Sequence, residues 1–543
     1  MKTALISVYN KQGIVEFAKD LAALDFNILA SGGTAKELLA AGIEVMDVAT
    51  IVGEPILGHR VVTLSRELHA ALLSRDTAED EAELKRIGVP KIDLVCVDLY
   101  PLTEEIKKTG STLESVIEKT DIGGPTMLRS AAKGRRIVVC DPADRQNVIS
   151  WLKNGEPDRE NFISSLVAKA EAVVADYCLA SARYHSAGKY EGMVLREILT
   201  CKYGENGYQT PAGLYDEGGN DELALPKFKL ISGTAPSYNN WADTDRLLQT
   251  ITHIAAGFDC NPSLALPSGG EGKLHIAVGV KHGNPCGAAV GDNPSSVIQK
   301  MLEGDLRAIF GGVVMVNFEI DEKLAEVLLT HKMTNGRRLL DGIIAPEFSS
   351  AAIEMLRRKG DKCRFLVNEA LSSLSKDSLD RHRRFRYVRG GFLAQPNYTF
   401  ILDLNNNADK SARYSSGMLS DQQKADMLLA WAIGSTSNSN TVTIVKDGML
   451  LGNGVGQQDR VGCCQLAIKR ATDAGHDIKG AVAYSDSFFP FVDGPQTLID
   501  AGISAIFATS GSVKDPDVRK FCADRGVTLY LVPDVEARGF FGH

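Results

Sequence analysis

The chain lacks the sequence features of a membrane-spanning, secreted or zinc-binding protein. No apolar run approaches the ~18 residues needed to cross a membrane. Lys11 soon interrupts the short apolar stretch near the N-terminus, so we expect no signal peptide. The ten cysteines include no Cys-x-x-Cys pair, which indicates scattered thiols instead of a disulfide framework or a zinc site. We therefore expect a cytoplasmic protein with no metal among its site residues.

An excess of positive charge is absent as well. Sixty Lys and Arg residues against 68 Asp and Glu residues give a formal net charge of −8, which is unlike a dedicated nucleic-acid-binding protein. Any phosphate that the chain binds must therefore be held by a local site. The proportions of hydrophobic residues (44%) and charged residues (24%) are those of a globular protein. A length of 543 residues allows about three or four domains.

The hydrophobic pattern predicts an α/β protein in two parts. In roughly the first 195 residues, strand-like segments alternate with amphipathic helices in the βαβ rhythm of a largely parallel sheet. These strand-like segments are residues 3–8, 26–30, 94–99 and 137–140. An Ala-rich helix at 166–183 and a polar joint at 185–191 follow. The remainder combines strands, helices and longer loops, such as 261–273 and 405–417, and has room for two subdomains.

Two glycine-rich turns in the first part predict a phosphate-binding site. Residues 31–34 (Ser-Gly-Gly-Thr) lie before a helix expected from Ala35, with Thr34 and Glu37 as its capping box. Residues 121–126 (Asp-Ile-Gly-Gly-Pro-Thr) form a second turn of this kind. Free backbone N–H groups and the positive end of the helix dipole favour phosphate at such turns. An ordinary tight turn is the alternative for each.

Polar and basic side chains accompany these turns. Ser7 and Lys11 follow the first predicted strand, and Arg129 and Lys133 lie one turn apart on the helix after the second glycine turn. Together they predict a phosphate-bearing ligand at the carboxyl ends of parallel strands. Sugar phosphates, nucleotides and inorganic phosphate all satisfy this pattern, and a solvated helix face is the alternative for Arg129 and Lys133.

In the second part, Lys281 and His282 directly follow the apolar segment 274–280. Histidine can act as a general base near neutral pH, and an adjacent lysine can stabilise developing negative charge. A surface Lys-His pair is the alternative. Residues 485–491 place aromatic side chains beside a carboxylate, which suits a flat heterocycle or a simple core. The glycines of residues 452–456 lack the spacing of a dinucleotide-binding loop.

Taken together and in this order, the motifs resemble those of one family over nearly the whole chain. This is the bifunctional purine-biosynthesis family of aminoimidazole-carboxamide ribonucleotide (AICAR) transformylase/inosine monophosphate (IMP) cyclohydrolase. The markers are Ser-Gly-Gly-Thr (31–34), Leu-Tyr-Pro (99–101), Asp-Ile-Gly-Gly-Pro-Thr (121–126), Lys-His-x-Asn-Pro-Cys-Gly (281–287), Gly-Gln-Gln-x-Arg (456–460) and Asp-x-Phe-Phe-Pro-Phe (486–491).

The resemblance implies a fold, two reactions and an assembly. Residues 1–195 would form a methylglyoxal-synthase-like (Rossmann-like) cyclohydrolase domain, and 196–543 a transformylase domain of two cytidine-deaminase-like subdomains. The second domain would transfer a formyl group from 10-formyltetrahydrofolate to AICAR, supported by a monovalent cation. The first would close the product to IMP with loss of water. The implied partners are these nucleotides and the folate, without nucleic acid polymer or membrane, in a homodimer with shared transformylase sites.

The resemblance also assigns site residues, motif by motif. For formyl transfer, His282 would be the base, Lys281 would stabilise the oxyanion or assist the leaving nitrogen, and Asn440 would orient these partners. The other residues of this site would be Lys202, Tyr203, Phe310, Gly312, Arg460, Phe488 and Arg538 for the nucleotide, and Pro490, Asp493 and Ser512 near the folate. For ring closure, Lys133 would transfer the proton, beside Asp121 and Tyr100. Its nucleotide contacts would be Ser7, Lys11, Ser31, Gly32, Gly33, Thr34, Arg60, Thr63, Thr126 and Arg129.

The chain departs from the family pattern in both parts. Val62 and Ser65 stand where lysine and histidine are usual, and Asp98 replaces the asparagine before Leu-Tyr-Pro. Valine cannot donate a proton, and a carboxylate adds negative charge near an anionic ligand. Lys202 replaces an arginine and loses its bidentate phosphate fork. Residues 207–208 read Gly-Tyr in place of Pro-His.

Two alternatives to a bifunctional enzyme follow from these departures. One is a transformylase whose N-terminal domain has lost ring closure. The other is a nucleotide-binding sensor or scaffold without catalysis. Because Lys281, His282 and Asn440 are retained, the sequence favours catalysis and preserves the transformylase half better.

Overall fold

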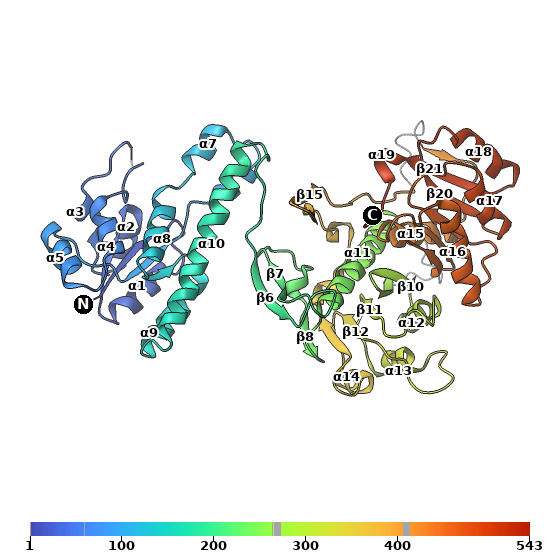
Figure 1. Ribbon diagram of the computed structural model, residues 1–543, viewed down its shortest axis with the longest axis horizontal. Coiled ribbons are helices and arrows are strands. Elements are labelled where there is room, and N and C mark those ends of the chain that lie inside the picture. The colour runs from blue at the N-terminus through green and yellow to red at the C-terminus, as the bar shows by residue number, and fades with distance from the viewer. Residues whose placement is uncertain (1, 59, 263, 265–272, 405–412, 543) are drawn as a thin grey trace. The chain divides into compact units, whose positions relative to one another are not determined.

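The computed structural model describes residues 2–58, 60–262, 264, 273–404 and 413–542. The chain divides into two compact units, residues 1–195 and 196–543, which Figure 1 colours from blue to teal and from green to red. Both units combine helices with sheets, so the predicted α/β class is confirmed. The expected long loops at 261–273 and 405–417 lie mostly outside the described residues. Among the described residues, no helix is long and apolar enough to cross a membrane.

Unit 1 is built on a five-stranded parallel sheet with the strand order β3-β2-β1-β4-β5. Its strands are β1 (Lys2–Ser7), β2 (Phe26–Ala30), β3 (Met46–Asp47), β4 (Leu94–Val97) and β5 (Ile137–Val139). Its helices are α1 (Ile14–Ala22), α2 (Gly32–Ala40), α3 (Ala49–Val52), α4 (Arg66–Leu73), α5 (Ala78–Ile87), α6 (Leu102–Lys107), α7 (Leu113–Glu118), α8 (Gly123–Lys133), α9 (Arg145–Lys153) and α10 (Arg159–His185). Successive strands are added to either side of β1, so the strand order reverses between β1 and β4. Open α/β sheets bind ligands at this point, outside the carboxyl ends of the strands.

Apolar side chains on both faces of the sheet explain why unit 1 folds this way. Ala4, Leu5 and Ile6 of β1 are all fully buried, as expected for a central strand covered by helices on both sides. The longest helix, α10, packs against α8 and β5 and buries Ile163, Leu166, Ala170 and Val174 on one face. Helices α8 and α10 thus form one layer next to β4 and β5, and the second glycine turn lies at the start of α8.

The predicted capping box at Thr34 is wrong. Helix α2 begins at Gly32 instead of Ala35, and Ser31 precedes it without a side-chain cap. The Thr34 hydroxyl accepts from the backbone N–H of Val8 at 3.2 Å and from Lys11 Nζ at 3.1 Å, so it bonds to the loop after β1. This tertiary contact takes the hydroxyl away from the local N–H groups that a cap would satisfy.

Unit 2 is built on a twelve-stranded sheet with the order β16-β21-β20-β19-β17-β18-β10-β9-β11-β12-β13-β8. Its strands are β8 (Lys229–Ser232), β9 (His275–Lys281), β10 (Asn284–Gly291), β11 (Val313–Val316), β12 (Gly342–Ala345), β13 (Arg364–Val367), β16 (Tyr414–Ser415), β17 (Val442–Lys446), β18 (Met449–Gly454), β19 (Val482–Ser485), β20 (Ala505–Ser510) and β21 (Thr528–Pro533). Two separate hairpins are β6 (Arg196–Cys201) with β7 (Ala212–Asp216), and β14 (Arg384–Val388) with β15 (Gly391–Gln395). The helices are α11 (Tyr238–Cys260), α12 (Pro294–Glu303), α13 (Glu322–Thr330), α14 (Ser350–Leu356), α15 (Asp421–Ser435), α16 (Arg460–Asp473), α17 (Asp493–Asp500), α18 (Asp515–Asp524) and α19 (Asp534–Ala537).

The large sheet consists of two halves with the same order of elements. A long helix, an antiparallel hairpin and three further strands with intervening helices run from α11 to β13 and again from α15 to β21. The halves meet where β10 pairs with β18. Helices α11 and α15 pack on each other against one face of the sheet (Figure 1). Because strand side chains alternate between faces, Ile276 and Val278 contact this layer while Ala277 belongs to the opposite core, with α12 and α13.

Equivalent glycines let a helix cross each half closely. A Cβ atom added to Gly287 in β10 would lie 2.0 Å from the carbonyl oxygen of Met301 in α12. At the same place in β18, a Cβ on Gly452 would lie 2.2 Å from the carbonyl oxygen of Ala467 in α16. Since these neighbours are backbone atoms, any side chain at either glycine would force the helix away from the sheet. This shared contact supports the correspondence of the two halves.

Candidate active sites

In unit 1, four of the predicted nucleotide contacts meet at the carboxyl end of β1. The hydroxyl groups of Ser7 and Ser31 form a hydrogen bond, with their oxygens 2.7 Å apart. Lys11 donates to the hydroxyl of Thr34 at 3.1 Å and also to the carbonyl oxygen of Val8. Burial lowers the pKa of Lys11. The start of α2, which no side chain caps, lies beside these side chains, as an anion site requires.

Asp98 has a structural task that the sequence did not reveal. Its carboxylate accepts from the backbone N–H groups of Tyr9 and Asn10, the second at 3.2 Å, and so holds the loop after β1 against the end of β4. Burial raises the pKa of Asp98. Two backbone N–H groups therefore stabilise the negative charge of Asp98 that the sequence placed near an anionic ligand.

The second glycine turn brings Asp121, Tyr100 and Thr63 together. Asp121 accepts from the N–H of Gly124 at 2.8 Å and from the N–H of Tyr100 at 3.4 Å, and burial raises the pKa of Asp121. A Cβ on Gly124 would lie 2.5 Å from Asp121, and one on Gly123 would lie 2.6 Å from the Thr63 hydroxyl. The two glycines are thus needed for close approach of these side chains to the backbone.

The predicted residues of α8 lie on one helix face, but the expectation that Lys133 lies beside Asp121 and Tyr100 is wrong. Lys133 ends the helix, about 15 Å along its axis from Gly123. Thr126 and Lys133 are seven residues apart on this face, with Ser130 between them. Arg129, next to Ser130, pairs with Glu171 of α10 at 3.2 Å and is exposed. Thr126 donates to the carbonyl oxygen of Ile122 at 2.7 Å.

His69 is a further residue at this face, and the sequence patterns did not single it out. His69 Nδ1 lies 2.9 Å from the hydroxyl oxygen of Ser130, in the middle of the α8 face that carries Thr126 and Lys133. Burial lowers the pKa of His69, which keeps the imidazole neutral at pH 7. Only the helical spacing of Ser130 between Thr126 and Lys133 could have pointed to this face, and nothing local links it to His69.

The departures from the family pattern have structural roles. Ser65 is the N-cap of α4, where its hydroxyl accepts from the N–H of Leu68 at 3.2 Å. Val62 is half-buried and packs against the core under α4 and α8. Arg60 is exposed and donates to the carbonyl oxygen of Leu57 at 2.8 Å. No side-chain hydrogen bond or ion pair joins Arg60 to the other predicted residues among those the structure describes.

In unit 2, Lys281 and His282 lie at the turn between β9 and β10. Lys281 pairs with Asn284, so His282 and Gly283 form a two-residue turn, with φ angles of 53° and 72°. Such a turn suits the twist of an antiparallel hairpin. Lys281 Nζ donates to the carbonyl oxygen of Phe310 at 2.6 Å, which brings the predicted loop of Phe310 and Gly312 to the same place. His282 is exposed.

Asn440 and Arg460 form a second cluster, centred on a buried ion pair. The Asn440 side-chain oxygen accepts from Arg460 Nη2 at 2.9 Å, and its amide donates to the carbonyl oxygen of Gln457 at 2.8 Å. Arg460 Nη1 pairs with Asp486, whose carboxylate is fully buried and also accepts from the N–H of Thr441 at 3.1 Å. Arg460 therefore orients Asn440.

Arg538 and Phe488 form a third cluster. The Arg538 guanidinium lies 5.7 Å from the centre of the Phe488 ring and donates to Ser487 at 3.1 Å and to Asp534. Pro490 follows Phe488 after one residue, and Asp493 starts α17. Ser512 comes directly after Gly511, and a Cβ atom added to Gly511 would lie 3.9 Å from the Phe488 ring.

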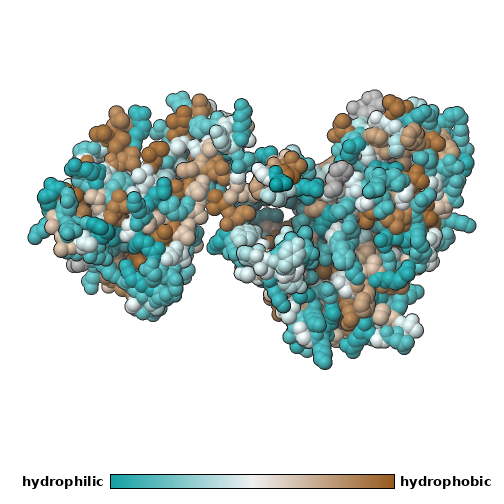
Figure 2. Space-filling view, in the orientation of Figure 1, coloured by the Kyte–Doolittle hydropathy of each residue, from teal (hydrophilic) through white to brown (hydrophobic). Residues whose placement is uncertain are grey.

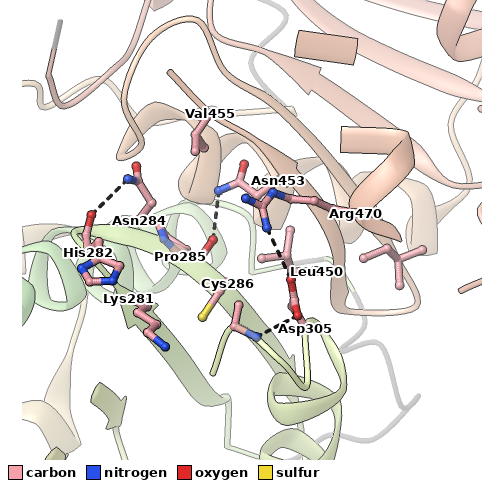
Figure 3. Close-up of a pocket in the computed structure, with 14 residues that line it drawn as sticks. Lys281, His282, Asn284, Pro285, Cys286, Asp305, Leu450, Asn453, Val455 and Arg470 are labelled. Atoms are coloured by element: carbon pink, nitrogen blue, oxygen red, sulfur yellow. Dashed lines mark hydrogen bonds and ion pairs between the residues drawn. The ribbon is translucent and has the colours of Figure 1, made fainter. Parts of the chain in front are cut away.

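A pocket of about 260 Å³ adjoins the turn of Lys281 and His282. Figure 3 shows these two residues at one end of the pocket and Asp305 with Arg470, 3.5 Å apart, at the other. The Asn284 amide donates to the His282 carbonyl oxygen at 3.2 Å (Figure 3). Burial raises the pKa of the Cys286 thiol in this pocket to about 12, so it is not a nucleophile at neutral pH.

Lys202 and Tyr203 lie in the loop between β6 and β7, apart from these clusters in the described contacts. The loop closes on itself through the N–H of Gly204, which donates to the carbonyl oxygen of Gln209 at 2.8 Å. It reaches the start of α11 where Asn239 donates to the carbonyl oxygen of Glu205 at 3.3 Å. Tyr208, which stands in place of the usual histidine, is 82% exposed and contributes no packing here.

Both units thus place polar side chains at the ends of strands, as in an enzyme with two separate sites. The AICARFT/IMPCHase bienzyme family model matches residues 131–470, and the MGS-like domain model matches residues 13–126. The bifunctional purine biosynthesis protein PurH of Anoxybacillus flavithermus is 35% identical over 542 residues, which cover 97% of this chain and 98% of that protein. A solved structure, "Crystal structure of ForH", is 32% identical and matches 35% of this chain and 100% of that chain, with a TM-score of 0.32. The chain belongs to the AICARFT/IMPCHase bienzyme family, with an MGS-like N-terminal domain.

Tyr177 of α10 supports the Asp121 turn and provides a test of it. The N–H of Asp121 donates to the Tyr177 hydroxyl at 2.7 Å, and this hydroxyl donates to the carbonyl oxygen of Lys119 at 3.2 Å. Tyr177→Phe leaves this N–H without its partner, at a cost of about 1–3 kcal/mol. We expect amide hydrogen exchange of residues 119–124 to become about tenfold faster or more. Tyr184→Phe, two turns further along α10, is the control, and equal exchange in both variants would contradict the role of Tyr177.

Proposed function

We propose that unit 2 transfers a formyl group from 10-formyltetrahydrofolate to AICAR, and that unit 1 closes the product to IMP. The observation that carries this proposal is the turn of Lys281 and His282 beside a pocket, with Lys281 bonded to the Phe310 loop. Family membership over nearly the whole chain supports both activities. We assign residues 1–195 to the cyclohydrolase and 196–543 to the transformylase, in agreement with the two compact units.

In the proposed formyl transfer, His282 removes the proton of the attacking amine. The AICAR 5-amino group is a weak nucleophile because its lone pair is conjugated with the ring, so a base that acts during attack lowers the barrier. The amine nitrogen bonds to the formyl carbon, and the bond from that carbon to N10 of the folate then breaks. Lys281 stabilises the oxyanion and supplies a proton to N10. Asn440, held by Arg460, orients these groups. A monovalent cation belongs to the same proposal.

In the proposed ring closure, the carboxamide nitrogen attacks the formyl carbon of the same molecule, and water leaves. Since both reacting groups belong to one molecule, orientation supplies much of the rate. Ser7, Ser31 and Thr34 with the start of α2 would hold the phosphate. Asp121 would orient the carboxamide. Lys133 lies at the opposite end of α8, about 15 Å along the helix from this turn, so we do not assign it the proton transfer. Val62 removes a proton donor from this site, so we expect ring closure to be the slower of the two activities.

A homodimer is part of the proposal, because one hairpin presents apolar side chains that the described residues of its own unit leave largely exposed. Tyr387, Phe392 and Leu393 on β14 and β15 are 71%, 64% and 61% exposed. We call this hairpin, β14 and β15, the arm. Figure 2 shows brown, apolar atoms on the arm, at the position of β15 in Figure 1. A two-stranded hairpin is marginally stable by itself and gains most from packing against another surface. A second copy of the chain would cover it.

A cytoplasmic location is also proposed. All ten cysteines are free thiols, and seven of them are buried. Free cysteines are typical of proteins that work in a reducing compartment.

Formyl transfer tests the role of His282. We expect His282→Ala to lower the rate of formyl transfer from 10-formyltetrahydrofolate to AICAR by about 100-fold or more, since general-base catalysis contributes that much. Closure of added formyl-AICAR to IMP should stay unchanged because its site lies in unit 1. His382→Ala, which changes an exposed histidine of unit 2, is the control. A wild-type protein that binds AICAR but transfers no formyl group would be the sensor alternative.

Ring closure tests the role of Val62. The wild-type protein should convert formyl-AICAR to IMP faster than the spontaneous reaction, and Val62→Lys should raise this rate by about tenfold or more by restoring a proton donor. A lysine fits a half-buried position because its stem packs while the ammonium reaches solvent. Val62→Met, with similar bulk and no charge, should leave the rate unchanged. A wild-type rate equal to the spontaneous rate would favour the transformylase-only alternative.

Sedimentation tests the homodimer. We expect the wild-type chain to sediment as a dimer, and Phe392→Ser combined with Leu393→Ser to shift it towards monomer, because the apolar area of the arm is lost. Formyl transfer should fall in parallel, since the sites would be shared between chains. Met418→Ser, at a lone apolar side chain that is 96% exposed, is the control. A wild-type monomer with full formyl transfer would refute the shared sites.

A further inference from the structure

Arg246 of α11 contacts three segments that meet at the proposed transformylase site. Its Nε donates to the carbonyl oxygen of Gly283 at 2.7 Å, and its Nη2 donates to the side-chain oxygen of Asn438. Its guanidinium carbon lies 3.7 Å from the centre of the Phe541 ring. These partners belong to the β9–β10 turn, the loop before β17 and the C-terminal tail. One side chain therefore joins segments that are far apart in the sequence.

The two peptide groups that flank Gly283 are both held by one turn of α11. Asp243, three residues before Arg246, accepts the Gly283 N–H at 2.7 Å, while Arg246 donates to the carbonyl oxygen. His282 precedes Gly283 and has a positive φ of 53°, which few conformations allow. Asp243 fixes the His282–Gly283 peptide plane and Arg246 fixes the Gly283–Asn284 plane, so the two together fix the direction in which the imidazole leaves the backbone.

Asn438 extends the same support to Asn440. Asn438 lies two residues before Asn440, and its N–H donates to the side-chain oxygen of Asn284 at 3.3 Å. The Asn284 amide in turn donates to the carbonyl oxygen of His282 at 3.2 Å. A closed path of hydrogen bonds thus runs from Arg246 through Asn438 and Asn284 to the turn of His282. The proposed base and the loop of Asn440 are coupled through Arg246.

The second repeat shows that the fold does not need an arginine at this place. Helices α11 and α15 start with equivalent capping boxes at Ser237 and Ser420. Asp426 then corresponds to Asp243, and it accepts from the N–H groups of Asp447 and Gly448 in the second turn. The position of Arg246 is taken by Leu429, which is fully buried. The arginine occurs in the repeat whose turn carries a histidine, and the other repeat has Asp447 at that point.

Arg246 is also a costly residue to bury. It is only 8% exposed, and burial lowers its pKa to about 10, so it stays charged at neutral pH. A buried cation destabilises a fold unless its donors are satisfied. Leucine at the equivalent position shows that an apolar side chain fits this layer. The charge at this position is best explained by the hydrogen bonds of the guanidinium to Gly283 and Asn438.

We propose that Arg246 is a positioning residue for formyl transfer, which aligns His282 and Asn440 towards one substrate without touching it. The inference rests on the proposed function, because it takes His282 and Asn440 as the catalytic pair. A displacement of reacting groups by about 1 Å costs roughly 100-fold in rate, and this sets the scale of the expected effect.

The test compares three variants of the full chain. Arg246→Met keeps the side-chain length and removes the donors, so we expect kcat for formyl transfer to fall about 100-fold. The KM for AICAR should change less than about threefold, since positioning acts mainly on the reacting step. Arg246→Lys should recover part of kcat, because one ammonium replaces one of the two bonds. Arg384→Met is the matched control.

Arg384 is a matched control because it shares with Arg246 the contact with the tail and the nearby charge of Asp245, but it bonds to neither Gly283 nor Asn438. Its guanidinium carbon lies 3.8 Å from the centre of the same Phe541 ring, and it donates to the Phe541 carbonyl oxygen at 2.7 Å. Arg384→Met should keep kcat within about threefold, because the Gly283 and Asn438 bonds remain. Equal loss of kcat in Arg246→Met and Arg384→Met would overturn the inference, because tail anchoring alone would then explain it.

The remaining outcomes are also decisive. An unchanged kcat in Arg246→Met would refute the positioning role. If this variant does not fold, as judged by its circular dichroism and thermal unfolding, Arg246→Lys decides. A tenfold or larger loss of kcat at constant KM and unfolding temperature would support the role, and wild-type kcat would refute it. If His282→Ala loses formyl transfer and Arg246→Met does not, only this inference is refuted. If His282→Ala keeps formyl transfer, the proposed function is refuted.

Discussion

Carboxylates that accept backbone N–H groups hold four of the loops on which the proposed chemistry depends. Asp98 and Asp121 do this in unit 1, and Asp243 and Asp486 in unit 2. An ionised carboxylate makes stronger hydrogen bonds than a neutral acceptor, and it leaves no N–H of a tight turn unpaired. Burial raises the pKa of Asp98, Asp121 and Asp243, which shows that the fold bears a cost for these bonds. The loops are therefore rigid supports.

The repeated architecture of unit 2 shows how one scaffold acquires a site in only one half. Both repeats hold their first hairpin by an aspartate on the long helix, Asp243 or Asp426. Both also use a lysine at the end of the strand: Lys281 donates to the Phe310 carbonyl oxygen, and Lys446 to that of Asp477 at 3.3 Å. The frame is thus common, while the residue at the turn differs. The chemistry depends on side chains added to this frame, and Arg246 is one of these additions.

In unit 1, residues that depart from the family pattern have taken up structural roles. Ser65 caps α4, Val62 packs on the core, and Asp98 holds the loop after β1. Each contact stabilises local structure independently of a ligand, so these substitutions are compatible with the fold whether or not ring closure is fast. Tyr177 and His69 add contacts from neighbouring helices to the Asp121 turn and to α8. The site is therefore supported from several sides although one expected lysine is missing.

Hydrophobic periodicity and glycine positions determined the α/β class, most strands and the turns at Ser31 and Asp121, because these depend on local steric and burial preferences. The motif around Lys281 was likewise legible in the sequence. Only the tertiary structure decided which groups support it: Arg246 reaches Asn438, 192 residues away, and Tyr177 reaches Asp121, 56 residues away. It also moved the start of α2, since the Thr34 hydroxyl bonds to a loop of another strand. Such contacts arise from sheet order and helix packing, which no local pattern encodes.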